Sequence, residues 1–309
     1  LNYLVVGPWN HGGWARANGS TLGPIQFGAN TSAFFRDSVE APWFGYWLKD
    51  KGKLDLPEAL TFRSGSNTWQ RHAAWPPKRG VTTKALYLGP GGSLSWAKPS
   101  AAAGVDAFVS DPAQPVPYRS RPIFPLYGGN PASSWSLWQV DDQRHSHLRP
   151  DVLSFETAPL DAEVTLSGKV IANLYAATTG TDADWIVKLI DVYPDKNDGA
   201  LEMSGYQLMV VGDVFRGRFL KSFERPSPLV PNRVTSYSIG LHATDYTFKQ
   251  GHRIMVQVQS TWFPLIDRNP QTFVPNIFQA TDAAYRVQTH RVYRSSRYPS
   301  HLEVSVADR

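Results

Sequence analysis

The sequence predicts a mainly β protein, a β-sandwich of jelly-roll type that follows a short α/β segment. Between residue 54 and the C-terminus, several short runs alternate apolar with polar residues, as strands do when one face is buried. Turns rich in Gly and Pro separate these runs. Helical periodicity is confined to about the first 50 residues. Many short strands with such turns and almost no helix are typical of a β-sandwich.

Residues 1–53 are expected to form a strand, a loop and a helix. The apolar run at residues 3–6 is typical of a buried parallel strand, and a Gly-Pro pair ends it. After a glycine-rich loop, Thr31 or Ser32 can cap a helix. Beyond them, apolar side chains recur at every fourth position: Phe35, Val39, Trp43 and Trp47. Pro42 lies within that pattern and predicts a kink or a break.

Residues 54–309 are expected to form the sandwich. Strands are predicted where β-branched and aromatic residues cluster or alternate with polar ones: 169–178, 185–193, 237–241, 254–258 and 302–306. In the second of these, Lys188 shares a face with Ile186 and Ile190, so its ammonium group needs a partner or a route to solvent. Residues 98–150 have few strand signals and many prolines, and we expect a long ordered connection there.

Composition and charge exclude several functions. The chain has 31 Lys and Arg against 26 Asp and Glu, and this net charge of +5 is too mild and dispersed for nucleic acid to be a partner. No apolar run approaches the roughly 18–20 residues that span a bilayer, so no membrane is expected either. The absence of Cys removes disulfides, thiolate nucleophiles and zinc sites built on Cys. No phosphate-binding, zinc-protease or calcium-loop motif is present, and we expect no cofactor.

Two alternatives start from single residue patterns. His145 and His147 have the spacing that places two imidazoles on one face of a strand, which would suit a metal, although a solvated turn beside Arg144 and Arg149 is the preferred interpretation. The 11 Trp could line a carbohydrate-binding groove of a non-catalytic β-sandwich module. Most of them lie in strand-like runs, where packing in the core is the default; examples are Trp69, Trp75, Trp185 and Trp262.

His11 is the most informative residue. It lies in a glycine-rich loop five residues after the predicted strand at residues 3–6, and a predicted helix follows. In α/β hydrolases, the catalytic triad runs Ser, then Asp or Glu, then His along the chain, each just beyond the carboxyl end of a strand. A histidine between the last strand and the last helix fits the third place in that order. On the residues alone, an ordinary loop histidine is still the preferred interpretation.

A resemblance to a known family favours the catalytic interpretation of His11 over the ordinary loop histidine. The matching stretches are Gly7-Pro8-Trp9-Asn10-His11-Gly12, Phe27-Gly28-Ala29-Asn30-Thr31, Asp141-Asp142-Gln143-Arg144, Arg149-Pro150-Asp151-Val152-Leu153, residues 180–185, 191–195, 215–218 and 251–254, and the longest at residues 263–272. In this order they cover nearly the whole chain. The chain resembles the C-terminal part of the X-prolyl dipeptidyl-peptidase-like serine hydrolases. This group contains α-amino-acid ester hydrolases, glutaryl-cephalosporin acylases and cocaine esterase.

The resemblance implies a fold, an activity and site residues. Residues 1–53 would be the C-terminal end of an α/β-hydrolase catalytic domain, and residues 54–309 a jelly-roll domain. His11 would be the general base of a Ser-Asp-His triad, with Trp9, Asn10 and Trp14 orienting it or lining the substrate pocket. The intact protein would cleave esters or amides of small acyl groups, such as α-amino-acid esters, β-lactam acyl side chains or X-Pro dipeptides.

The departure from the family pattern is large, because the sequence has no Gly-x-Ser-x-Gly motif and none of Ser20, Ser32, Ser66 and Ser93 lies on a strand-to-helix elbow. The nucleophile and the triad Asp would precede residue 1, and the chain, which starts at Leu1 inside an apolar region, is expected to be inactive alone. Its partners would be the missing catalytic domain, a small ester or amide substrate and further copies in a homo-oligomer. The compartment is open, with a periplasmic or secreted location favoured over the cytoplasm.

Overall fold

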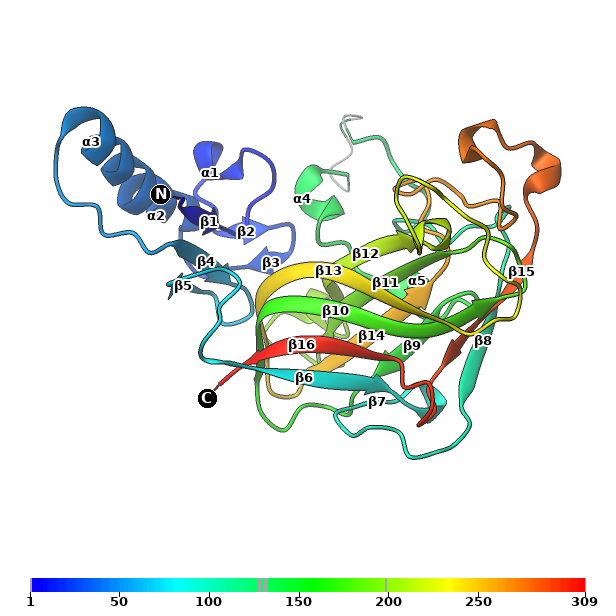
Figure 1. The fold of residues 1–309 in the computed structure, drawn as a ribbon. Coiled ribbons are helices and arrows are strands. Elements are labelled where there is room, and N and C mark those ends of the chain that lie inside the picture. Colours follow the sequence, from blue (N-terminus) through cyan, green and yellow to red (C-terminus); the bar gives the residue numbers. More distant parts are fainter. Residues whose placement is uncertain (1, 127–128, 130–132, 198, 309) are drawn as a thin grey trace.

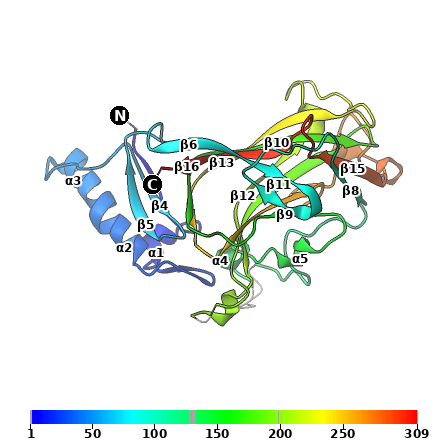
Figure 2. The same cartoon turned by 90° about the horizontal axis from the view of Figure 1, so that it is seen from below.

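The computed structural model describes residues 2–126, 129, 133–197 and 199–308. Strands dominate, as predicted, and they form a two-sheet β-sandwich with a smaller region beside it (Figure 1). We call residues 2–72 the N-terminal region and residues 81–308 the sandwich. Seen from below, the N-terminal region lies at one end of the sandwich, and its helices point away from the two sheets (Figure 2).

The N-terminal region contains the predicted strand, loop and helix. Its elements are β1 (Leu4–Val6), α1 (Gly13–Arg16), β2 (Thr21–Leu22), β3 (Ile25–Gln26), α2 (Thr31–Phe35), a π-helical turn (Arg36–Glu40), α3 (Ala41–Lys49), β4 (Ala59–Arg63) and β5 (Thr68–His72). The helix predicted at this point is one continuous run whose irregularity precedes Pro42. There the Ala41 N–H donates to the Arg36 carbonyl, one residue further back than in an α-helix. Proline has no N–H and cannot donate the next hydrogen bond of an α-helix. The π-helical turn therefore lies where the regular series of α-helical hydrogen bonds would be interrupted.

The sheet of the N-terminal region extends beyond residue 53. β1 pairs with β4 in parallel, with Leu4 opposite Ala59 and Val6 opposite Thr61, and β5 adds an antiparallel strand. In this three-stranded sheet β1 is therefore an edge strand. A boundary between residues 53 and 54 stays a prediction, and the β4–β5 hairpin shares its sheet with the segment before that boundary.

The sandwich consists of two sheets of unequal size. The larger runs β7-β6-β16-β10-β15-β8, with β13 also paired to β10, and the smaller runs β12-β11-β14-β9. Their strands are β6 (Val81–Leu88), β7 (Leu94–Ser95), β8 (Val105–Ser110), β9 (Leu153–Glu156), β10 (Val164–Thr178), β11 (Asp184–Val192), β12 (Gln207–Arg216), β13 (Thr235–Phe248), β14 (Arg253–Gln259), β15 (Gln288–Tyr293) and β16 (His301–Ala307). All five predicted strands are present.

The core lies between the two sheets. Leu174 on β10 and Tyr237 on β13 belong to the same buried cluster as Trp185, Val187 and Leu189 on β11. Trp185 is completely buried and packs its ring against Tyr237 at a centroid distance of 5.5 Å. The alternation read from the sequence thus places every second residue of β11 in the core.

The other face of β11 is also buried, because the connection that includes α4 (Trp135–Trp138) and α5 (Arg144–His147) covers it. Lys188 has the partner that the sequence demanded: its Nζ donates to Gln143 Oε1 at 2.9 Å and lies 4.8 Å from the centre of the Trp262 ring. Burial lowers the pKa of Lys188 to about 7. The described part of the predicted connection therefore packs on the sandwich, and it also contributes the edge strand β8.

A buried carboxylate joins the two regions. Asp245 on β13 accepts hydrogen bonds from Thr61 Oγ1 and Arg63 Nε, both at 2.6 Å, and His72 Nε2 lies 3.3 Å away. The Asp245 side chain is only 2% exposed. Three side chains of the β4–β5 hairpin thus converge on one group of the sandwich.

Within the described part of the chain, no helix is long and apolar enough to cross a bilayer.

Candidate functional site

His11 lies in the loop that follows β1. The chain leaves the strand at Val6 and turns back at Gly12, whose φ of 75° is in the left-handed region that favours glycine, before α1 begins at Gly13. The His11 side chain is exposed. Among the residues that the structure describes, none forms a hydrogen bond or an ion pair with its ring. Both imidazole nitrogens are therefore free to serve as donor or acceptor.

Trp9 packs inward, two residues before His11. Its Nε1 donates to Thr31 Oγ1 at 2.8 Å, and its ring contacts Phe35 and Trp69 at centroid distances of 5.3 and 5.9 Å. The indole also lies directly against Gly7, where a Cβ would come within 2.3 Å of it. Trp9 thus belongs to the aromatic packing that supports the loop.

Asn10 and Trp14 lie on either side of His11 in the chain. The Asn10 carbonyl accepts the Gly13 N–H at 2.9 Å, which closes the turn that presents His11. Trp14 is 36% exposed, and its ring faces the imidazole edge-on at a centroid distance of 6.3 Å. Of the three predicted neighbours, Trp14 is the one that shares an exposed surface with His11.

The hydroxyl and carboxylate groups of the described residues form no hydrogen bond with the His11 ring. A general base must reach the proton that it abstracts at about 2.6–3.2 Å, directly or through a water. The nearby hydroxyl groups are used elsewhere: Ser20 Oγ donates to Asn18 Oδ1 at 3.0 Å, and Ser32 Oγ donates to the Gly13 carbonyl at 3.2 Å. No carboxylate of the described residues orients the imidazole. The chemistry open to His11 therefore depends on groups outside these residues.

The structure contradicts the geometry on which the metal alternative depended. His145 and His147 lie on the short helix α5, not on a strand, so a spacing of two does not put them on one face. His145 Nδ1 lies 2.8 Å from the Asp142 carbonyl, and His147 Nδ1 lies 2.8 Å from Gln207 Nε2. No group of three or more possible metal-ligating side chains occurs within the described ranges.

The tryptophans do not favour a carbohydrate groove. Trp185 and Trp262 are 0% and 5% exposed, in agreement with packing in the core. The tryptophans that are at least about one-third exposed lie on separate elements: Trp14, Trp47, Trp96 and Trp135. His11 is exposed, whereas the carbohydrate interpretation would leave it buried and without a role.

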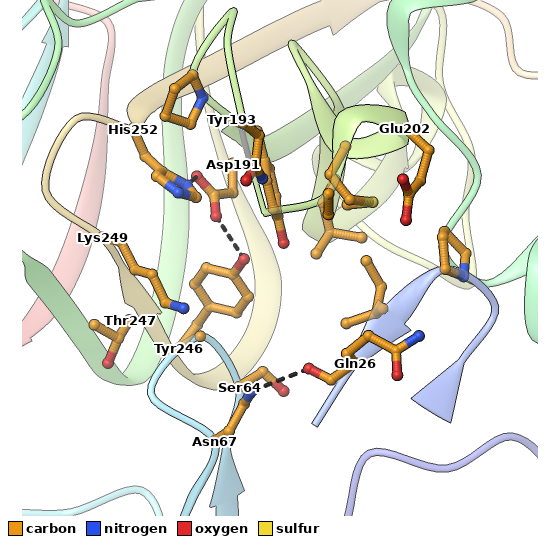
Figure 3. Close-up of a pocket in the computed structure, with 18 of the residues that line it drawn as sticks. Gln26, Ser64, Asn67, Asp191, Tyr193, Glu202, Tyr246, Thr247, Lys249 and His252 are labelled. Carbon is orange, nitrogen blue, oxygen red and sulfur yellow. Dashed lines mark hydrogen bonds and ion pairs between the residues drawn. The ribbon is translucent and has the colours of Figure 1, made fainter. Parts of the chain in front are cut away.

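A cavity of about 430 Å³ lies between the β2–β3 hairpin and the end of the sandwich (Figure 3). Asp191 sits at its inner end and accepts hydrogen bonds from the Tyr246 hydroxyl at 2.6 Å and from His252 Nδ1 at 2.8 Å. The side chains of Lys249 and Glu202 also line it. Its innermost polar groups thus pair with one another, which gives Asp191 a structural role. Sequence reasoning missed this cavity, because Gln26 and His252 on its walls are far apart along the chain.

Known proteins resemble this chain over its whole length. An aminopeptidase from a marine sediment Thaumarchaeota archaeon is 46% identical in sequence over the aligned residues, with a TM-score of 0.95, and the match covers 100% of this chain and 50% of its own. An α-amino acid ester hydrolase is 44% identical, with a TM-score of 0.93, and the match covers 99% of this chain and 50% of its own. The cocaine esterase of Rhodococcus sp. (strain MB1 Bresler) is 29% identical over 99% of this chain and 51% of its own length.

The chain thus spans about half the length of the relatives that it matches. Residues 51–303 match a protein family described as the X-Pro dipeptidyl-peptidase C-terminal non-catalytic domain. That match covers the β4–β5 hairpin and the sandwich as far as residue 303, and it confirms the family resemblance read from the motifs. The chain belongs to the X-Pro dipeptidyl-peptidase C-terminal domain family.

Proposed function

We propose that this chain is the C-terminal part of a serine hydrolase that cleaves esters or amides of small acyl groups, and that His11 is its general base. The observation that carries the proposal is the exposed, unpartnered imidazole at the carboxyl end of β1. The names of the relatives, among them an aminopeptidase and two ester-cleaving enzymes, support a hydrolase. The half-length match leaves room for a catalytic segment before residue 1.

The proposed reaction has two halves. His11 takes the proton of the serine hydroxyl as Oγ attacks the substrate carbonyl, and the resulting imidazolium then protonates the departing alcohol or amine. In the second half His11 deprotonates a water, which attacks the acyl-enzyme; the acyl–Oγ bond breaks, the acid leaves, and the imidazolium returns its proton to the serine Oγ. The Ser and the Asp that orients the imidazole come from the preceding segment. The two free nitrogens of His11 suit these two contacts.

The surface of the N-terminal region supports a preceding domain as its partner. Large apolar side chains are exposed on β1 and α3, and β1 is the edge strand of its sheet. The most exposed of them are Val6 at 45%, Phe44 at 47%, Trp47 at 44% and Leu48 at 71%. Edge strands and contiguous apolar surfaces are normally paired or covered. We assign residues 1–53 to the catalytic α/β domain on this basis. For the whole enzyme we keep the predicted periplasmic or secreted location.

The two solved relatives with 44–46% identity favour acyl groups that are α-amino acids. Their names give an aminopeptidase and an α-amino acid ester hydrolase, so α-amino-acid esters and N-terminal amides head the proposed substrates. β-Lactam acyl side chains and X-Pro dipeptides complete the class.

The test is a pair of histidine variants in the full-length protein. We expect His11→Ala to lower kcat/KM on an amino-acid p-nitrophenyl ester by about 10⁶-fold, since the members of a triad act as a unit. His242→Ala is the matched control, because His242 is exposed on β13 and forms an ion pair with Asp213 there. Equal activity of the two variants would disprove the assignment of His11.

A further inference from the structure

We propose that Thr31, Ser32 and Arg36, at the start of the helical run α2–α3, are positioning residues that hold His11 in its catalytic place. The inference rests on the proposed role of His11 as general base. The segment that they hold, residues 7–20, is called the His11 loop below. Each of the three side chains forms a hydrogen bond to this loop.

Thr31 ties both ends of the His11 loop with one hydroxyl group. Its Oγ1 accepts the hydrogen bond of Trp9 Nε1 at 2.8 Å and donates to the Gly19 carbonyl at 2.6 Å. Thr31 is completely buried, so water does not compete for either bond. Trp9 lies two residues before His11, and Gly19 lies eight residues after it. One buried oxygen therefore fixes the entry and the exit of the loop.

Ser32 and Arg36 hold the middle of the loop. Ser32 Oγ donates to the Gly13 carbonyl at 3.2 Å, and the Ser32 N–H donates to the Asn18 carbonyl at 2.9 Å. Arg36 Nη1 donates to the carbonyls of Trp14 at 2.7 Å and Ala17 at 3.0 Å. These carbonyls end the short helix α1, where no residue of the helix itself can satisfy them. All of these bonds go to the backbone, and they leave the His11 ring free.

The loop needs such support because its sequence gives it little stiffness. It contains four glycines, which lose more conformational entropy on ordering than any other residue. Gly19 also seats the loop directly on the helix, because a Cβ at this position would come within 2.1 Å of Ser32 Oγ. A displacement of about 1 Å in a catalytic group can lower a rate about 100-fold. The three side chains thus convert a flexible loop into a fixed mount for the imidazole.

The test compares Thr31→Val with Thr31→Ser in the full-length protein. Valine keeps the shape but removes both hydrogen bonds, whereas serine keeps the hydroxyl group. We expect Thr31→Val to lower kcat about 100-fold with KM changed less than about 2-fold. Thr31→Ser should retain most of the activity. Ser38→Ala is the matched control, because Ser38 is exposed on the adjoining helical turn.

A double variant distinguishes positioning from general destabilisation. In a His11→Ala background, Thr31→Val should cause no further loss of rate, since it acts only through the imidazole. An additional loss of similar size would overturn the proposal, and so would a folded Thr31→Val with normal kcat while His11→Ala is inactive. Full activity of His11→Ala would instead overturn the proposed function.

A second variant keeps the proposal testable if Thr31→Val does not fold. Arg36 is not buried, so Arg36→Met should fold, and it removes only the two bonds to the end of α1. We expect kcat to fall about 10-fold, in line with the loss of bonds to a charged donor, with KM unchanged. A rise in KM with unchanged kcat would contradict a positioning role.

Discussion

The two regions of the molecule differ in how far the apolar side chains of their main elements are buried. In the sandwich, all nine residues of β11 are buried, because the second sheet covers one face and the connection covers the other. In the N-terminal region, α3 has no buried residue at all, and Leu48 is 71% exposed. The sandwich thus completes its own core, whereas the N-terminal region presents both an apolar surface and a free histidine. The complete core and the exposed histidine thus lie in different regions of the chain.

The largest expected effect tests whether the N-terminal region can act by itself. The purified 309-residue chain should show neither a burst nor turnover of a p-nitrophenyl ester, because His11 has no nucleophile within the described residues. The full-length protein, assayed in parallel, should show both. If the isolated chain turned over the ester, and the His11→Ala variant of it did so too, neither a preceding segment nor His11 would be needed for catalysis. The contrast drawn between the two regions would then be wrong.

The next effect compares the two apolar environments directly. Trp185→Ala leaves a cavity in the sandwich core and should lower the free energy of unfolding by about 3–5 kcal/mol in the isolated chain and in the full-length protein. Leu48→Ser should change it by less than about 0.5 kcal/mol in the isolated chain. In the full-length protein Leu48→Ser should cost about 1–2 kcal/mol, since α3 is proposed to be covered there. Chemical denaturation of the four samples measures both effects.

An equal response to Leu48→Ser in the two proteins would show that the preceding domain does not cover this face. A second copy of the chain would then be the partner to examine, since a homo-oligomer is also predicted. Sedimentation of the full-length protein distinguishes these outcomes.

The smallest expected effect is a pH dependence inside the sandwich. The folded pKa of Lys188, about 7, lies below the value of roughly 10.4 for an exposed lysine, so between these values the unfolded chain holds the additional proton. Stability should therefore rise with pH from about 7 to 10, and the full cost of the buried charge applies below pH 7. Lys188→Met should reduce that slope by up to about 1.4 kcal/mol per pH unit.

The exposed Lys169 provides the control for this measurement. Lys169→Met should leave the slope of unfolding free energy against pH unchanged, because its ammonium is solvated in both states. An identical slope for wild type and Lys188→Met would show that Lys188 keeps an ordinary pKa.

The features that could be predicted from the sequence are those that depend on the residues of one short segment alone. The strands β10, β11 and β14 were predicted because each shows its own alternation or its own β-branched and aromatic residues. The need of Lys188 for a partner followed from that alternation, yet the partner, Gln143, is 45 residues away on a connection without periodicity. The pairing of β1 with β4 could not be read for the same reason, since strand pairing is a tertiary property.

The candidate site shows the same limit. The position of His11 after a strand was visible in the sequence, but its exposure and its free nitrogens depend on how Thr31 and Trp69 pack from other elements. The spacing of His145 and His147 was misleading, because side chains two residues apart lie on one face only in a strand. That stretch is helical. The cavity around Asp191 left no local pattern to detect.

The contact at Asp245 has a mechanical consequence. Thr61, which donates to Asp245, lies in register beside Val6, the last residue of the strand that leads into the His11 loop. The sandwich is therefore anchored one strand away from the base of that loop, not hung on a flexible tether. Separating the two regions would remove partners from a buried carboxylate, which is costly. The Asp245 contact thus couples the sandwich to the strand that leads into the His11 loop.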